Sequence, residues 1–80
     1  MKKFVVALIS FFENEIKQFK IEAESDYDAV KKTLVEFAGE HKESEIEFQN
    51  SADYPKNIEE LDDHLNNCEM GFSVIEVKDF

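Results

Sequence analysis

The stretch Phe4-Val5-Val6-Ala7-Leu8-Ile9-Ser10-Phe11-Phe12 decides the fold, because it is the only long, uncharged and nearly continuous apolar run in the chain. Alternate side chains of an extended strand point to opposite faces, and here both faces are apolar. A strand with one face in water would alternate with polar residues. The run therefore predicts a strand that is covered on both faces. The two sets are Phe4, Val6, Leu8 and Phe12, and Val5, Ala7, Ile9 and Phe11.

The length and composition predict one folded domain over residues 1–80. Hydrophobic residues make up 42% of the chain and aromatic residues 12%, which is too much for a disordered acidic tail. A chain of 80 residues uses most of its apolar side chains for packing, so a large buried active site is not expected. The single Cys68 allows no internal disulfide and fits a reducing cytoplasm.

The N-terminal segment has a basic start and an apolar middle, as a signal peptide has. However, Phe11–Glu15 follows in place of a small-residue cleavage site. The apolar run is also too short to span a bilayer. We therefore expect a cytoplasmic protein that makes no use of a membrane.

Charge is unevenly distributed along the chain. Residues 1–32 contain six Lys and six acidic residues, whereas residues 33–80 contain three Lys and thirteen acidic residues. The second half therefore carries the whole net charge of −10. The chain has no Arg, so bidentate clamping of phosphates is not available, and direct binding to nucleic acid is disfavoured.

The segment after the first strand predicts a hairpin. Glu13–Glu15 is polar enough for a turn, and residues 16–24 alternate as a second strand. Ile16 is out of phase with the other apolar positions of this strand, which indicates a bulge near Lys17 or Gln18. The in-phase apolar positions are Phe19, Ile21 and Ala23.

A helix and a short strand are expected next. Ser25 is a typical N-terminal cap, apolar residues then recur at spacings of three and four, and Gly39 is a typical stop. Residues 45–49 alternate with period two, which predicts a short peripheral strand with Ile46 and Phe48 facing inward.

A second helix and a last strand complete the chain. Asn57 and Glu60 form a cap pair, and the helix should end near Gly71. Residues 72–78 are rich in β-branched side chains and predict a strand. The result is an α+β fold of order ββαβαβ, with a mainly antiparallel sheet of three to four strands and two helices packed on one face. The apolar positions of the second helix are Ile58, Leu61, Leu65 and Cys68.

Both helices have narrow apolar stripes, so each can cover only one face of the sheet. If both lie on the same face, the other face exposes one apolar set of the first strand together with parts of Val74, Ile75 and Val77. We expect that face to bind a second copy or another partner. The alternatives are that the helices flank opposite faces or that the long loop covers the second face.

The acidic second half supplies the candidate partner-binding residues. Carboxylates crowd the polar face of the second helix, and no Lys four residues further on relieves their repulsion. Such a surface can imitate a polyanion and occupy a cationic groove of a nucleic-acid-binding protein, or it can serve solubility alone. Tyr54, beside Pro55, is expected to be an exposed aromatic anchor. The candidates are Glu36, Glu40, Glu43, Glu45, Glu47, Asp53, Tyr54, Glu59, Glu60, Asp62, Asp63 and Glu69.

No motif predicts catalysis, a metal site or a cofactor. His64 and Cys68 are four residues apart and could form half of a zinc site, but the chain has no second half and no calcium-loop pattern. It also has no nucleophile elbow and no glycine-rich loop. We expect a non-enzymatic protein in which His64 lies on the surface and Cys68 packs as a small apolar core residue.

In its size, its charge and its Lys-, Glu-, Phe- and Asn-rich composition, the chain resembles the small acidic α+β proteins of phages and mobile elements. That group includes DNA-mimicking inhibitors of restriction and of CRISPR systems. The resemblance implies an inhibitor whose acidic half docks on a basic protein surface. The alternative is a dimeric structural or regulatory module that acts through the apolar sheet face. A small-molecule-binding domain is the third candidate.

Overall fold

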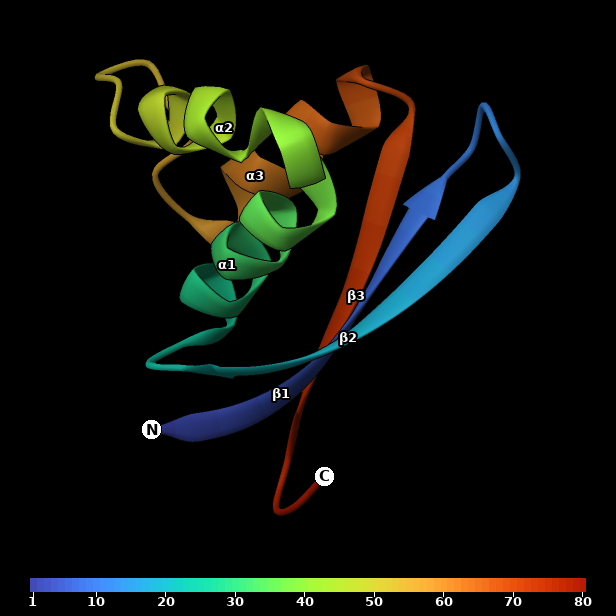
Figure 1. The fold of residues 1–80 in the computed structure, drawn as a ribbon, viewed down its shortest axis with the longest axis vertical. Helices are drawn as coiled ribbons and strands as arrows, with labels where there is room; N and C mark the ends of the chain where they lie inside the picture. The colour runs from blue at the N-terminus through green and yellow to red at the C-terminus, as the bar shows by residue number, and fades with distance from the viewer.

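The computed structural model describes residues 1–80 and confirms an α+β fold (Figure 1). Its element order is ββαααβ, so the predicted order ββαβαβ is wrong. The elements are β1 (Lys2–Ser10), β2 (Glu15–Ala23), α1 (Asp26–Ala38), the 3-10 turn η1 (Gly39–His41), α2 (Lys42–Gln49), α3 (Ile58–Asn67) and β3 (Met70–Val77).

The sheet has three antiparallel strands in the order β2-β1-β3, so the four-stranded alternative is excluded. The strand β1 lies in the centre, where it pairs with both neighbours and where its uncharged segment from Phe4 onward, rich in β-branched residues, fits best. The predicted hairpin of β1 and β2 is confirmed. The pairing runs without interruption from Lys2–Ala23 to Ser10–Glu15, so the bulge expected near Lys17 or Gln18 is absent.

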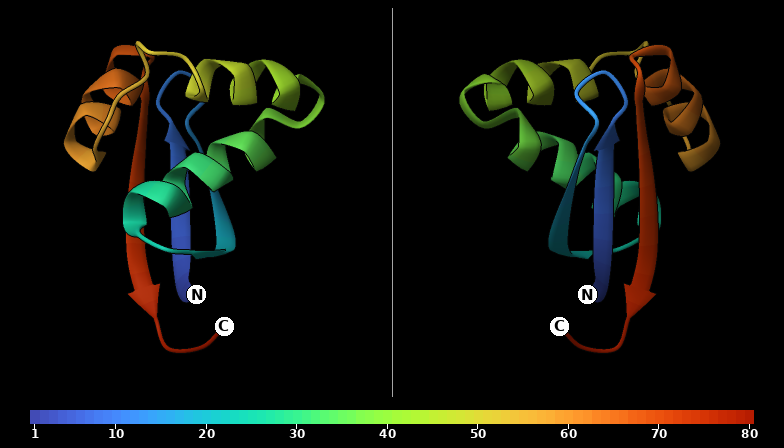
Figure 2. Two further views of the ribbon diagram at one scale, coloured as in Figure 1. Left: turned by 90° about the vertical axis from the view of Figure 1, so that its left-hand side faces the viewer. Right: turned by 90° about the vertical axis from the view of Figure 1, so that its right-hand side faces the viewer.

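All the helices lie on one face of the sheet, as Figure 2 shows from opposite sides. The central side chains Phe4, Val6 and Leu8 are buried beneath them, whereas Val5 and Ile9 point to the other face and are only half-buried. The packing of helices on one face is therefore confirmed, and the expectation that β1 is covered on both faces is wrong.

We call the uncovered side of the sheet the open sheet face. Directly paired residues of neighbouring strands point to the same side of a sheet, so the register defines its members. They are Lys3, Val5, Ala7 and Ile9 on β1, Ile16, Gln18, Lys20 and Glu22 on β2, and Gly71, Ser73, Ile75 and Val77 on β3.

Helix α1 begins and ends where the sequence predicts. The Ser25 hydroxyl accepts a hydrogen bond from the Asp28 backbone N–H at 3.2 Å, which satisfies one of the free donors of the first turn. At the other end, Gly39 has a φ of 56°, a value that side chains rarely adopt, and its N–H donates to the Glu36 carbonyl. The buried hydroxyl of Thr33 donates to the Ala29 carbonyl at 2.8 Å, so it costs the core little.

Residues 45–49 form the second half of α2, so the strand predicted there is wrong. A run of five alternating residues is too short to separate the two periodicities, and Glu, Lys and Gln are good helix formers. The chain also continues through η1 from α1 directly into α2, so Gly39 marks a bend between helices. Ile46 and Phe48, which were expected to face inward, are 42% and 38% exposed.

Helix α3 begins at the predicted cap pair. The Asn57 side chain accepts from the Glu60 backbone N–H at 2.9 Å, and the Glu60 carboxylate accepts from the Asn57 amide at 3.1 Å and from the Lys56 backbone N–H at 3.3 Å. The helix ends at Asn67, earlier than predicted. Cys68 is exposed, so the expectation that it packs in the core is wrong.

The hydrophobic core lies between the sheet and the helical layer. Its centre is formed by the inward face of β1 and by the apolar stripes of α1 and α3. The buried members are Phe4, Val6, Leu8, Ile21, Ala23, Ala29, Val30, Leu34, Tyr54, Leu61 and Leu65.

Candidate functional site

The eleven candidate carboxylates lie in the helical layer and its connections. Four belong to α3, which contains no Lys, and three belong to α2. The two helices meet through Phe48 and His64, whose ring centroids are 5.4 Å apart. The carboxylates of α2 and α3 therefore belong to one continuous layer, on the side of the sheet opposite to the open sheet face (Figure 2).

None of these carboxylates takes part in an ion pair. The three ion pairs of the structure are Lys3–Asp79 at 3.5 Å, Lys17–Glu15 at 3.7 Å and Lys32–Asp28 at 3.7 Å. They join residues of the sheet, of the chain end and of the first turns of α1. The negative charge of α2 and α3 is consequently free to attract an external cation.

Two of the candidates are engaged inside the protein. Glu60 caps α3, as described above, and Glu45 accepts a hydrogen bond from the Gln49 amide at 2.9 Å. Gln49 also donates to the Lys31 carbonyl at 2.9 Å, which ties α2 to α1. Asp62 is half-buried. The remaining acids are exposed and unengaged, and we call them the acidic helical surface: Glu36, Glu40, Glu43, Glu47, Asp53, Glu59, Asp63 and Glu69.

Tyr54 is only 5% exposed, so the expectation that it is a surface anchor is wrong. Its ring meets the ring of Phe48 edge to face, with centroids 5.0 Å apart. The neighbouring Pro55 is buried as well, and its carbonyl accepts a hydrogen bond from the Tyr27 hydroxyl at 2.5 Å. These contacts fasten the loop between α2 and α3 to the core, so Tyr54 is a packing residue.

The Tyr54 hydroxyl has no hydrogen-bond partner although it is buried. Burial raises the pKa of this phenol far above 10.0, and the nearby charge of Glu45 and the presence of Tyr27 raise it further. The group therefore stays neutral at any physiological pH, and it is not a general base or a nucleophile.

A cavity of about 230 Å³ lies between the three helices beneath α2. This is below the range of roughly 300–1,000 Å³ that is typical of ligand pockets. Its lining is mainly apolar, and Glu45 and His64 are the titratable side chains beside Tyr54 and Cys68. Nowhere does the structure place three or more His, Cys, Asp or Glu side chains so that they could hold a metal ion. The lining residues are Leu34, Phe37, Ala38, Glu45, Phe48, Tyr54, His64, Leu65, Cys68 and Met70.

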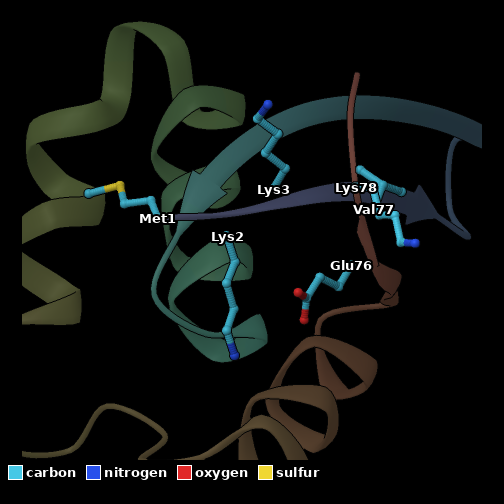
Figure 3. Close-up of a pocket in the computed structure, with 6 residues that line it drawn as sticks. All are labelled: Met1, Lys2, Lys3, Glu76, Val77 and Lys78. Atoms are coloured by element: carbon cyan, nitrogen blue, oxygen red, sulfur yellow. The ribbon is translucent and has the colours of Figure 1, made fainter.

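A second depression lies where the strand ends meet, beside Met1 (Figure 3). Lys2 and Glu76 point to one side of the strands there, whereas Lys3 points to the other. Lys3 is also engaged, with its ammonium 3.5 Å from the Asp79 carboxylate and 5.8 Å from the centroid of the Phe80 ring. Because the lysines diverge, they do not converge on one anion.

The open sheet face is apolar along its centre. Val5 lies between Lys20 and Ile75, and Ile9 lies between Ile16 and Gly71. Ile16 and Ile75 are 64% and 57% exposed. The Phe11 ring lies over Gly71, where an added Cβ would be 3.0 Å from the tip of the ring, so this glycine makes room for the phenyl group. None of the helices has the length and the apolar character needed to cross a bilayer.

These features define a small two-layer α+β protein with an acidic helical layer and an apolar, uncovered sheet face. Comparison of the chain with protein-family models, with curated proteins and with solved structures finds no match. The two surfaces themselves are therefore the features from which a function is inferred.

Proposed function

We propose that the protein is a non-enzymatic interaction protein, an inhibitor whose acidic helical surface docks on a basic surface of a nucleic-acid-binding protein. The observation that carries the proposal is the absence of ion pairs from all eleven carboxylates of the helical layer, although the chain has nine Lys. Like charges on neighbouring positions destabilise an isolated helix by a few tenths of a kcal/mol per pair. Helix stability alone does not account for an α3 without a single Lys.

A partner with a cationic groove fits this surface better than a nucleic acid or a membrane does. Carboxylates repel phosphates, and positive patches guide acidic partners to the groove that normally holds nucleic acid. Exposed charges are screened beyond about 8 Å at physiological ionic strength, so binding should weaken as salt is added.

The experiment is a pull-down from a nuclease-treated bacterial lysate at low salt, with elution by a salt gradient and identification by mass spectrometry. The test variant reverses three unengaged acids of α2 and α3: Glu47→Lys, Glu59→Lys and Asp63→Lys. Glu60 is left intact because it caps α3. The control variant makes the same change in charge away from α2 and α3: Glu13→Lys, Glu24→Lys and Glu76→Lys.

The proposal expects one nucleic-acid-binding protein to be retained by the wild type and by the control variant, and to be lost from the test variant. That protein should be released at moderate salt and displaced by added DNA or RNA. If the test variant retains its partner as well as the wild type does, or if the partner is insensitive to salt, the acidic helical surface serves solubility only.

A further inference from the structure

The open sheet face is left unused by acidic docking, since it lies on the other side of the molecule. A solvated face of an antiparallel sheet normally carries polar residues at alternate positions. Here the central strand instead presents Val5, Ala7 and Ile9, and Ile16 and Ile75 extend the apolar area on both sides. Burial of this apolar area in a contact would contribute about 25 cal/mol of favourable free energy for each Å².

We infer that the open sheet face binds the same face of a second copy, so that two sheets pack back to back with the acidic helical layers on the outside. The centre of the face suits this arrangement because Ala7 and Ser73 are small and lie side by side. Small side chains there let two sheets approach to the usual spacing of about 10 Å. The contact is of the two-fold type, in which each copy offers the same patch.

The charges favour a second copy as the occupant. The open sheet face carries both signs, with Lys3, Lys20 and Glu22 at one end, and it is otherwise uncharged. The excess negative charge lies in the helical layer. In a back-to-back dimer the two helical layers are about 30 Å apart, given about 10 Å for each layer contact, and this exceeds the screening length of about 8 Å. An anionic membrane would instead meet a molecule with a net charge of −10.

The area of the open sheet face indicates how tightly two copies should bind. Three strands of eight or nine residues cover about 28 Å by about 14 Å, or about 400 Å² in projection. Protruding side chains increase the accessible area, and Phe11, whose ring lies over Gly71, extends it at the hairpin end. The total for two copies is then close to the low end of specific interfaces, about 1,200 Å². The dimer should therefore dissociate in the micromolar to millimolar range.

The test is sedimentation equilibrium of the full chain between about 1 µM and about 1 mM. The wild type should pass from 9.3 kDa to twice that mass as its concentration rises. The double variant Ile16→Lys with Ile75→Lys should stay monomeric. The control is Ile46→Lys, which places a single Ile→Lys substitution on an exposed Ile of α2, and it should dimerise like the wild type. Each single variant, Ile16→Lys and Ile75→Lys, should weaken dimerisation relative to this control. Circular dichroism establishes that each variant is folded.

Two outcomes overturn the inference. One is that the wild type still has a mass of 9.3 kDa at about 1 mM, which would mean that the open sheet face does not bind a second copy. The other is that the Ile46→Lys variant stays monomeric whereas the double variant still dimerises. Added salt separates this inference from the proposed function, because salt should strengthen an apolar contact between two acidic chains and weaken docking on a basic groove. The triple charge variant of α2 and α3 should still dimerise.

Discussion

The buried hydroxyl of Tyr54 has given up its contact with water without gaining a hydrogen-bond partner. An unpaired polar group of this kind costs about 1–3 kcal/mol. We therefore expect Tyr54→Phe to raise the free energy of unfolding by about 1 kcal/mol, measured by urea unfolding followed by circular dichroism.

Tyr27 provides the matched control, because its hydroxyl donates to the Pro55 carbonyl. Tyr27→Phe removes that bond and leaves the carbonyl without this donor, so the free energy of unfolding should fall by about 1 kcal/mol. A loss of stability in Tyr54→Phe as large as that in Tyr27→Phe would mean that the Tyr54 hydroxyl is bonded in solution.

The raised pKa of Tyr54 predicts a loss of stability in alkali. The unfolded chain releases the phenolic proton near pH 10.0, whereas the folded protein holds it to a much higher pH. Below pH 10.0 the phenol is protonated in both the folded and the unfolded state, so its ionisation does not change the stability. At higher pH only the unfolded chain releases the proton, so the free energy of unfolding falls progressively as the pH rises. Urea unfolding at about pH 8, 10 and 11 measures this loss. Tyr54→Phe should show a smaller decline, and an equal decline in both proteins would assign the effect to other groups.

At the scale of the element, removal of the N-terminal cap of α3 should lower the stability of the protein. Asn57 provides the acceptor for the Glu60 N–H, so Asn57→Ala should lower the free energy of unfolding by about 1 kcal/mol. Asn66→Ala is the control, because Asn66 is an exposed residue near the other end of the same helix. Urea unfolding of the two variants gives the comparison, and equal effects would mean that the cap contributes nothing.

The helix ends that the sequence predicts correctly are those with a local chemical signal, whereas the last strand, predicted over residues 72–78 and observed as β3, is recovered from its β-branched composition. The Ser25 cap with Gly39, and the Asn57–Glu60 pair, place α1 and the start of α3 because each depends on hydrogen bonds within a few residues. The hairpin has a polar turn between two long apolar patterns, and its strands are recovered to within a residue or two.

Helix α2 could not be predicted because it has only two apolar residues, Ile46 and Phe48, and they lie two residues apart, as they would in a strand. No residue of α2 is buried, and its attachment to α1 passes through a side-chain amide to a backbone carbonyl, from Gln49 to Lys31. A helical periodicity needs apolar residues that recur at spacings of three and four, and α2 has none.

At the scale of the whole molecule, the two candidate surfaces were predictable to different degrees. The acidic residues and their separation from Lys are visible in the sequence, and the structure adds which of them are engaged inside the protein, namely Glu45 and Glu60. The exposure of Tyr54 was predicted wrongly, because a Pro-containing loop is usually on the surface whereas this one is fastened to the core by long-range contacts. Such contacts leave no local signal.

The position of β1 between β2 and β3 also has a consequence for how the protein is made. Its partners in β2 follow after a short turn, so the hairpin can form early during synthesis. Its partners in β3, from Met70 to Val77, are separated from it by most of the chain. A nascent chain that lacks these residues therefore carries an unpaired and strongly apolar edge on β1, and a lone hairpin is only marginally stable. Truncation before Met70 should consequently produce an aggregating fragment, because the sheet is complete only once β3 has been synthesised and has paired with β1.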